Sequence, residues 1–303
     1  MNTFKHLIIA GTLRNAEKSL AKDIRHLKRV SSAFDRVDWI FIESDSTDAT
    51  PQLLEQYTSQ IENFRFRSLG NLSGQISDRV ARIAHCRNQY LLHIEDNLLV
   101  SKDSWLAVTD LDDLNTHLQA KDVLSAISLD VGDAYFANQR GPYFDIFALR
   151  HPVWNPEDCF ETLNALVEEG FSPQLASIIA VQSKQISIPS NEQPFQVESA
   201  FGGFGLYKAD SIRGARYTSL DADGQLICEH VGFHRQLVAR GLKLFIVPAL
   251  INSELTEHTG RRHPFRLYVQ PLFTFARQTL GFVFPRSSLE TIYKKARDLV
   301  PFL

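Results

Sequence analysis

The first third of the chain alternates short apolar runs with longer amphipathic stretches, and this alternation constrains the fold more than any other feature. Residues 6–12, 38–43 and 105–109 are apolar runs of strand length. The stretches 16–30 and 76–93 carry apolar residues at helical spacing. Strands that alternate with helices pair in parallel and carry those helices on their faces. The sequence therefore predicts an α/β fold with a mostly parallel sheet, in which ligands bind at the carboxyl ends of the strands.

The remainder of the chain is less regular. We expect strands at 123–130, 143–150, 194–207 and 243–250. Helices are expected at 156–183, interrupted near residues 170–173, and at 229–240. The strand at 194–207 contains a glycine break. No linker stands out before position 260, so these elements are expected to continue the same domain.

Composition excludes several classes of protein. Hydrophobic residues make up 44% and charged residues 22%, which is typical of a globular chain. The three cysteines (Cys86, Cys159 and Cys228) are scattered and form no C-x-x-C pair, so neither a disulfide framework nor a cysteine zinc site is expected. The sequence shows no signal peptide and no run long enough to span a membrane. We therefore expect a cytoplasmic protein.

An acidic cluster follows the strand expected at 105–109. Asp110 and Asp112 are separated by Leu111, and alternate side chains of an extended segment face the same way. Two such carboxylates form a site for a hard divalent cation that substrate phosphates and water complete. A metal there neutralises a diphosphate leaving group. The alternative is a solvated turn, or a helix N-cap at Asp112 or Asp113.

Glu43 ends the strand at 38–43. An acid in this position accepts hydrogen bonds from a ribose or a base edge in nucleotide-binding sheets. The alternative is a helix-capping turn, although Ser46, Thr47 and Asp48 serve that purpose without Glu43.

Four segments occur in the order seen in GT-A glycosyltransferases, which the chain resembles over about residues 5–260. The segments are 10–15, 43–50, Arg87 with Asn88, and 110–113. These enzymes are nucleotide-sugar-dependent and combine a Rossmann-like sheet with a D-x-D metal motif. Residues 143–150 and 200–205 are more faintly similar to capsule-associated mannosyltransferases. The resemblance implies a catalytic domain at 1–260, with a nucleotide-binding half (1–113) and an acceptor-binding half (114–260), followed by a helical extension at 261–303.

The resemblance also implies roles for individual residues. Thr12, Arg14 and Glu43 would line the nucleotide pocket, and Arg87 would reach the diphosphate. The Arg87 guanidinium suits that role on physical grounds because it binds phosphate oxygens in a bidentate manner; a salt bridge on the helix is the alternative. Asp112 would bind Mn²⁺ or Mg²⁺ directly, and Asp110 would help through the ribose or a metal-bound water.

Two later segments complete the expected site. Gly202 and Gly203 allow the backbone to approach a ligand closely, although a bulged strand packed on its neighbour would use the same glycines. The resemblance makes Glu229, at the start of the helix at 229–240, the candidate base that removes the acceptor proton in an inverting enzyme. Glu229 at this position also interacts favourably with the helix dipole, which is its alternative role.

A histidine after the last strand is a candidate metal ligand. The resemblance implies that His258 supplies this ligand, and neutral imidazole is competent for it. His230 and His263 are rival candidates. A structural role is the alternative for any lone histidine.

The segment 261–303 is basic and aromatic. It contains eight Lys or Arg and two Asp or Glu, in a chain whose net charge is −3. Such a segment suits peripheral contact with the inner face of a membrane, or an acceptor held on a lipid carrier. The alternative is a pair of helices that pack their aromatic faces on the core. Nucleic acid binding is not expected, because the rest of the chain is acidic and contains no recognised module.

The predicted function is metal-dependent transfer of a sugar from a UDP- or GDP-sugar to an acceptor hydroxyl. The expected acceptor is a glycan or lipid-linked glycan in cell-surface polysaccharide or glycoconjugate synthesis. A sugar nucleotidyltransferase is the nearest alternative, but it would need a glycine-rich basic loop where residues 10–14 contain one glycine. A non-catalytic nucleotide- or glycan-binding module is the second alternative.

Overall fold

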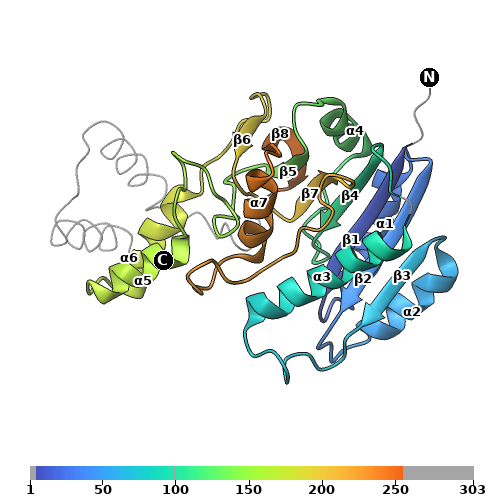
Figure 1. Ribbon diagram of the computed structural model, residues 1–303, viewed down its shortest axis with the longest axis horizontal. Coiled ribbons are helices and arrows are strands. Elements are labelled where there is room, and N and C mark those ends of the chain that lie inside the picture. Colours follow the sequence, from blue (N-terminus) through green and yellow to red (C-terminus); the bar gives the residue numbers. More distant parts are fainter. Residues whose placement is uncertain (1–4, 99, 255–303) are drawn as a thin grey trace, which may run out of the picture.

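The computed structural model of the protein describes residues 5–98 and 100–254. Within this part of the chain, a single sheet of eight strands carries helices on both faces (Figure 1). The strands are β1 (His6–Leu13), β2 (Arg36–Glu43), β3 (Phe64–Ser68), β4 (Ser104–Thr109), β5 (Ala134–Gln139), β6 (Phe195–Val197), β7 (Phe204–Lys208) and β8 (Leu244–Ser253). The helices are α1 (Leu20–Ser31), α2 (Thr50–Gln60), α3 (Arg79–Asn97), α4 (Ala120–Ser128), α5 (Cys159–Glu168), α6 (Pro173–Ala180), the 3₁₀ turn η1 (Gln182–Lys184) and α7 (Glu229–Ala239).

The sheet combines a parallel half with a mixed half, in the order β3-β2-β1-β4-β7-β5-β8-β6. Strands β3, β2, β1 and β4 are mutually parallel, so their carboxyl ends meet at one edge. Strand β7 is antiparallel to β4 and β5, and β6 is antiparallel to β8. The predicted α/β fold with a mostly parallel sheet is confirmed.

Two hydrophobic clusters hold the layers together. One joins the sheet to α3 and α7, and the other joins its opposite face to α1, α2 and α4. Helix α1 contributes Leu20, Ile24, Leu27 and Val30, whose spacing places all four on its buried side. Asp78 caps the amino end of α3: its side chain accepts a hydrogen bond from the Ala81 N–H and so satisfies one of the open donors of the first turn.

The strands expected at 123–130 and 143–150 were wrong. Residues 120–128 form helix α4, in which Val123 and Ala126 are buried one turn apart. The true strand, β5, is buried along its whole length and ends in Asn138 and Gln139, so it shows neither polar alternation nor a continuous apolar run. The stretch 143–150 is irregular and is held by side chains such as Asn155, which donates to the Ile146 and Leu149 carbonyls.

The expected strand at 194–207 proved to be two strands in different parts of the sheet. Strand β6 lies at the sheet edge beside β8, whereas β7 lies between β4 and β5. The two glycines between them therefore form a connection that enters the centre of the sheet.

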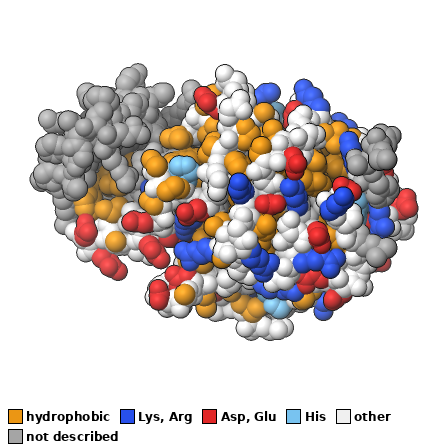
Figure 2. Space-filling view, turned by 45° about the horizontal axis from the view of Figure 1, so that its top comes forward, with side chains coloured by type: hydrophobic (Ala, Val, Ile, Leu, Met, Phe, Trp, Pro, Cys, Tyr) orange, Lys and Arg blue, Asp and Glu red, His pale blue; other side chains and the backbone are white. Residues whose placement is uncertain are grey.

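The outer surface differs between the two ends of the molecule. The pair α5 and α6 projects from the end opposite α2 and β3 (Figure 1). Figure 2 shows acidic side chains at this projecting end, and basic side chains interspersed with acidic ones on the larger body. None of the described helices combines the length and apolarity needed to cross a membrane.

Candidate active site

The residues predicted to bind the nucleotide lie at the carboxyl edge of the parallel half. Leu13 and Glu43 are register partners at the ends of β1 and β2. Thr12 is half-buried, and Arg14 is exposed in the loop that follows β1. The Arg14 Nε donates to the Asp45 carbonyl at 3.2 Å, so the loops after β1 and β2 are tied together. The structure thus brings Thr12, Arg14 and Glu43 to one edge.

Glu43 has a well-defined structural role. Its carboxylate is buried and accepts hydrogen bonds from the Ser46 N–H at 2.9 Å and from the Ser68 hydroxyl on β3. At the start of α2, the Asp48 carboxylate separately accepts hydrogen bonds from the Thr50 N–H and hydroxyl. Glu43 therefore shapes the turn that follows β2, while its contact with a ribose or base stays a prediction.

Arg87 lies in the interior, where it joins three elements. Its Nε on α3 donates to Glu229 Oε1 on α7 at 3.2 Å, and its Nη2 lies 3.6 Å from Asp110 Oδ1 after β4. The guanidinium also lies over the rings of Phe201 and Tyr217, at 5.1 and 5.5 Å from their centroids. Its Nη1 has no hydrogen-bond partner among the described residues. The ion pairs of Arg87 are thus long-range contacts, not a salt bridge along the helix.

Asp110 is poorly neutralised. Its pKa is raised to about 7, and burial is the largest cause. The carboxylates of Asp112, Asp145 and Glu229 also raise this pKa, whereas Arg87 lowers it. The side chain remains 36% exposed, and Asp112 is exposed beside it. The repulsion between these carboxylates favours the uptake of a proton or a metal ion by Asp110.

The glycines predicted to approach a ligand are required by the fold itself. Gly202 and Gly203 have φ angles of +67° and +86°, which side-chain-bearing residues rarely adopt. A Cβ at Gly203 would lie 2.2 Å from Leu114 Cδ2. The Gly203 carbonyl accepts a hydrogen bond from the Asp110 N–H at 3.0 Å. This turn therefore fixes the start of residues 110–113, which we call the acidic loop. Close packing against neighbours thus accounts for both glycines, and ligand approach stays a prediction.

A network of buried amides behind the acidic loop was missed by the sequence analysis. Gln139 Nε2 donates to Asn252 Oδ1 at 3.1 Å, and Asn252 Nδ2 donates to Asn115 Oδ1 at 2.8 Å. Asn115 Nδ2 in turn donates to the carbonyls of Asp110 and Gly203, both at 3.0 Å. Isolated Asn and Gln residues give no sequence signal for such a network, because their partners come from β5, β8 and the loop after β4.

Asp145 also escaped the sequence analysis. Its carboxylate accepts from the Gly202 N–H at 2.9 Å and from the Ala148 N–H at 3.2 Å. It lies close enough to Asp110 to raise the pKa of that carboxyl. Asp145 therefore adds negative charge to the site from the irregular stretch 143–150.

Glu229 is the first residue of α7, and its side chain is buried. The Cys228 thiol donates to its Oε2, the oxygen that is the candidate proton acceptor, with 3.8 Å between the sulfur and the oxygen. Its Oε1 is held by Arg87. His230 stacks on Phe201 with ring centroids 3.9 Å apart, and burial lowers its pKa well below the usual value. Neither His230 ring nitrogen has a hydrogen-bond partner among the described residues. His230 is thus a neutral, packed ring in the interior.

The described residues contain no cluster of three or more His, Cys, Asp and Glu side chains arranged to hold a metal. Asp110 and Asp112 fit Mn²⁺ or Mg²⁺ only as a partial set of oxygen ligands, which phosphates and water would complete. The candidate ligand His258, its rival His263 and the basic segment 261–303 lie outside the described residues.

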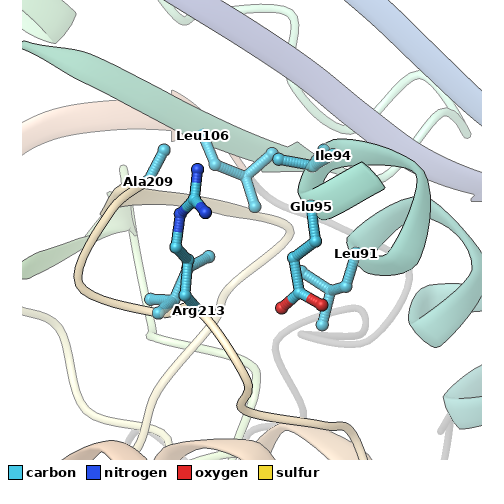
Figure 3. A pocket seen from close by; sticks show the side chains of 7 residues that line it. Leu91, Ile94, Glu95, Leu106, Ala209 and Arg213 are labelled. Carbon is cyan, nitrogen blue, oxygen red and sulfur yellow. The ribbon is translucent and has the colours of Figure 1, made fainter. Parts of the chain in front are cut away.

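A small recess elsewhere is not connected to this chemistry. It is lined mainly by apolar side chains such as Leu91, Ile94 and Leu106, between the second half of α3 and the loop after β7 (Figure 3). At its rim the Glu95 carboxylate pairs with Arg216 at 2.5 Å. No residue of the loop 110–113 lines this recess, since its lining comes from other segments.

Comparison with known proteins places the chain in a class. Residues 11–145 match the family model Glycosyl transferase family 2. No curated protein matches the chain. The mannosyltransferase PcManGT from Pyrobaculum calidifontis, solved with GDP-Man and Mn²⁺, shows 13% identity and a TM-score of 0.48, covering 98% of this chain and 70% of that chain.

Two further solved structures show similar relationships. S. aureus TarS 1-349 in complex with UDP-GlcNAc shows 13% identity and a TM-score of 0.44, with 98% of this chain and 73% of that chain covered. Glucosyl-3-phosphoglycerate synthase from Mycobacterium tuberculosis in complex with UDP shows 13% identity and a TM-score of 0.36, with 92% and 82% covered. These likenesses are too weak to bear on the substrate.

The sheet order and the family match agree. Residues 11–145, which run from the end of β1 past β5, match glycosyl transferase family 2, and the sheet that they begin has the mixed, mostly parallel order expected of a GT-A fold. The resemblance noted in the sequence is therefore confirmed at the level of class.

Proposed function

We propose that the protein transfers a sugar from a UDP- or GDP-sugar to a hydroxyl of a glycan or lipid-linked glycan, in the synthesis of a cell-surface polysaccharide or glycoconjugate. The observation that carries the proposal is the junction of Asp110 with Arg87 and Glu229 at the end of β4. This junction joins the half that matches family 2 to α7 in the second half. Residues 1–113 would bind the nucleotide, and residues 114–260 would bind the acceptor.

On the donor side, Thr12, Arg14 and Glu43 would line the nucleotide pocket. Asp112 would hold Mn²⁺ or Mg²⁺, with Asp110 acting through the ribose or a metal-bound water. The metal, when bound, supplies positive charge that stabilises the departing diphosphate. The repulsion that neighbouring carboxylates exert on Asp110 supports this assignment, because a cation relieves it.

On the acceptor side, Glu229 would act as general base if the reaction inverts configuration. The acceptor oxygen would form a bond to the anomeric carbon while the bond from that carbon to the diphosphate oxygen breaks. The hydroxyl proton would pass to Glu229 Oε2, because Oε1 is held by Arg87 at 3.2 Å. Arg87 would thereby position the carboxylate before the transfer.

The test measures release of UDP or GDP from a panel of nucleotide sugars, with and without Mn²⁺, for wild type, Asp112→Ala and Asp113→Ala. Asp113 is the matched control because it pairs with Lys22 at 2.6 Å on the surface. We expect Asp112→Ala to lose about 100-fold or more of the activity, and Asp113→Ala to stay within about threefold of wild type.

Turnover that needs neither metal nor Asp112 would contradict the proposed mechanism. Conversion of a sugar 1-phosphate and a nucleoside triphosphate would identify a nucleotidyltransferase instead. Nucleotide binding without turnover on any donor or acceptor would identify a binding module.

A further inference from the structure

Helix α1 presents a row of cations to solvent. Lys22, Arg25 and Arg29 follow one another at intervals of three and four residues, so they lie on one side of the helix. Lys18 precedes them by one turn, and Lys28 lies beside them. All five side chains are exposed. From Lys22 to Arg29 the row extends about 10 Å at the helical rise per residue.

Most of this charge has no counter-ion. Within residues 5–98 and 100–254, Lys22 pairs with Asp113, but no carboxylate lies within ion-pair distance of Lys18, Arg25, Lys28 or Arg29. The acid within α1, Asp23, is buried and turned toward the Asp113 N–H. In contrast, residues 152–183 at the projecting end contain five acidic residues and no Lys or Arg. The basic row is thus a local feature of a chain whose net charge is −3.

The row begins at the acidic loop of the candidate active site. The Ser19 hydroxyl donates to the Leu111 carbonyl at 2.9 Å, and the Asp113 N–H donates to Asp23 Oδ2 at 3.3 Å. The Lys22 ammonium contacts the Asp113 carboxylate at 2.6 Å. The first turn of α1 is therefore bound to residues 111–113, and the cations lead away from that loop along the helix.

The shape of the row favours a chain-like anion over a membrane surface. Helices that bind membranes insert apolar side chains into the bilayer. The apolar residues of α1, such as Ile24 and Leu27, are buried in the core. Among the described residues before Leu92, no large hydrophobic side chain is exposed. The helix thus offers charge along a line and no apolar residue for insertion.

We propose that the basic row on α1 binds a polyanionic acceptor, namely a glycan chain that carries phosphate or carboxylate groups and whose growing end reaches the acidic loop. The inference rests on the proposed function, because it names the acceptor class for the same site. It adds to the acceptor-binding half a contact on α1, which lies in the nucleotide-binding half. Cations spaced one helical turn apart exchange their counter-ions for the repeated anionic groups of such a chain, which makes binding strongly salt-dependent.

The test uses long-chain inorganic polyphosphate as the probe, with the full chain and without added metal. Binding is measured by fluorescence anisotropy between about 50 and about 200 mM NaCl. The variant Lys18→Gln/Arg25→Gln/Arg29→Gln removes three cations of the row. The control Lys5→Gln/Lys102→Gln/Arg235→Gln removes three exposed cations elsewhere, so both variants change the net charge equally.

We expect the row variant to bind polyphosphate about tenfold more weakly at low salt, with a salt dependence reduced by about two to three ions. The control should stay within about twofold of wild type. Equal losses in both variants, or no loss in either, would overturn the proposal. So would binding to vesicles of phosphatidylglycerol and phosphatidylcholine without binding to polyphosphate.

A thermal-shift measurement with UDP, GDP and Mn²⁺ separates this proposal from the proposed function. The row variant should keep the nucleotide-induced shift of wild type, because none of its three residues belongs to the nucleotide pocket. Absence of any nucleotide-induced shift in wild type would count against the proposed function, while the polyphosphate result would still decide whether the row binds polyanions.

Discussion

Two carboxylates on the same sheet, Asp38 and Asp110, have opposite electrostatic surroundings. Asp38, near the start of β2, accepts hydrogen bonds from His6 at 2.8 Å, Arg36 at 2.7 Å and Arg65 at 3.1 Å. Burial acts to raise the pKa of Asp38, but these three donors outweigh it and hold that pKa below its ordinary value. Asp110, after the end of β4, has Arg87 at 3.6 Å and a pKa raised to about 7.

The two carboxylates differ in how far their charge is compensated. At the amino edge of the sheet, where the parallel strands begin, His6, Arg36 and Arg65 compensate the charge of Asp38. A further cation would therefore gain little there. At the carboxyl edge, the Arg87 guanidinium pairs with both Asp110 and Glu229. Asp112 and Asp145 lie close enough to raise the pKa of Asp110. A strongly perturbed carboxyl at the end of a parallel strand is typical of a binding site, because a ligand cation relieves the repulsion between neighbouring carboxylates.

The largest effect is expected at the carboxyl edge. Asp110→Asn keeps the shape of the side chain and removes its charge, so nucleotide-sugar turnover should fall about 100-fold or more. The free energy of unfolding should not fall, because the neutral amide avoids repulsion from the neighbouring carboxylates. Steady-state kinetics and urea unfolding on one preparation measure both quantities. Retained turnover, or a large loss of stability, would remove the distinction between the two edges.

The amino edge should show the reverse behaviour. Asp38→Asn leaves His6, Arg36 and Arg65 without their anion, and we expect a loss of about 3 kcal/mol in the free energy of unfolding at pH 7. Because the folded pKa of Asp38 is lower than its ordinary value of 3.8, its contribution is present above that pH and is lost as the pH falls further. The gap between wild type and variant should therefore narrow below about pH 4. Turnover by the folded variant should match wild type, and a large loss of turnover would contradict this assignment.

Gly203→Ala tests how firmly the carboxyl edge is positioned. The substitution places a residue at a φ of +86° and its Cβ against Leu114, so we expect a loss of about 2 kcal/mol in stability. Gly214→Ala is the matched control, since Gly214 has a φ of +71° but no atom near its Cβ position. The control should lose about 1 kcal/mol from backbone strain alone. Equal losses in thermal unfolding would show that the contact with Leu114 is unimportant.

The smallest effect is expected at Asp23, a buried acid of α1 next to the acidic loop. Burial raises its pKa from 3.8 to about 6. Because the folded state holds its proton more tightly than the unfolded state, stability falls as the pH rises through this interval, and the cost is complete above it. Asp23→Asn should therefore stabilise the protein by about 1 kcal/mol at pH 7 and have little effect near pH 4. Thermal unfolding at both pH values measures the difference, and equal effects would contradict the titration of Asp23.

Much of the first half of the fold was predictable from the sequence. The strand expected at 38–43 is β2, and the helix expected at 76–93 is the core of α3. These elements carry their own periodicity, so local pattern is sufficient. Helix α4 and strand β5 were not predictable, because β5 is buried on both faces and ends in two amides that form long-range hydrogen bonds.

The candidate site divides in the same way. Asp110 and Asp112 followed from their position after a strand, and Arg87 and Glu229 came to notice as separate residues. Their junction did not, because 142 residues separate Arg87 from Glu229. Asp145 and the amide network through Asn115 and Asn252 gave no signal, since a single polar residue in an irregular stretch has many possible partners.

The sequence by itself determined the order of βα units and the arrival of acidic side chains at the ends of strands, because both depend on neighbouring residues. Only the tertiary structure decided how those charges are balanced. Packing of α3 and α7 on one face of the sheet brings one guanidinium to Asp110 and Glu229, whereas three donors reach Asp38. The balance depends on distances between segments remote in the chain, and those distances are set by the burial of the core as a whole.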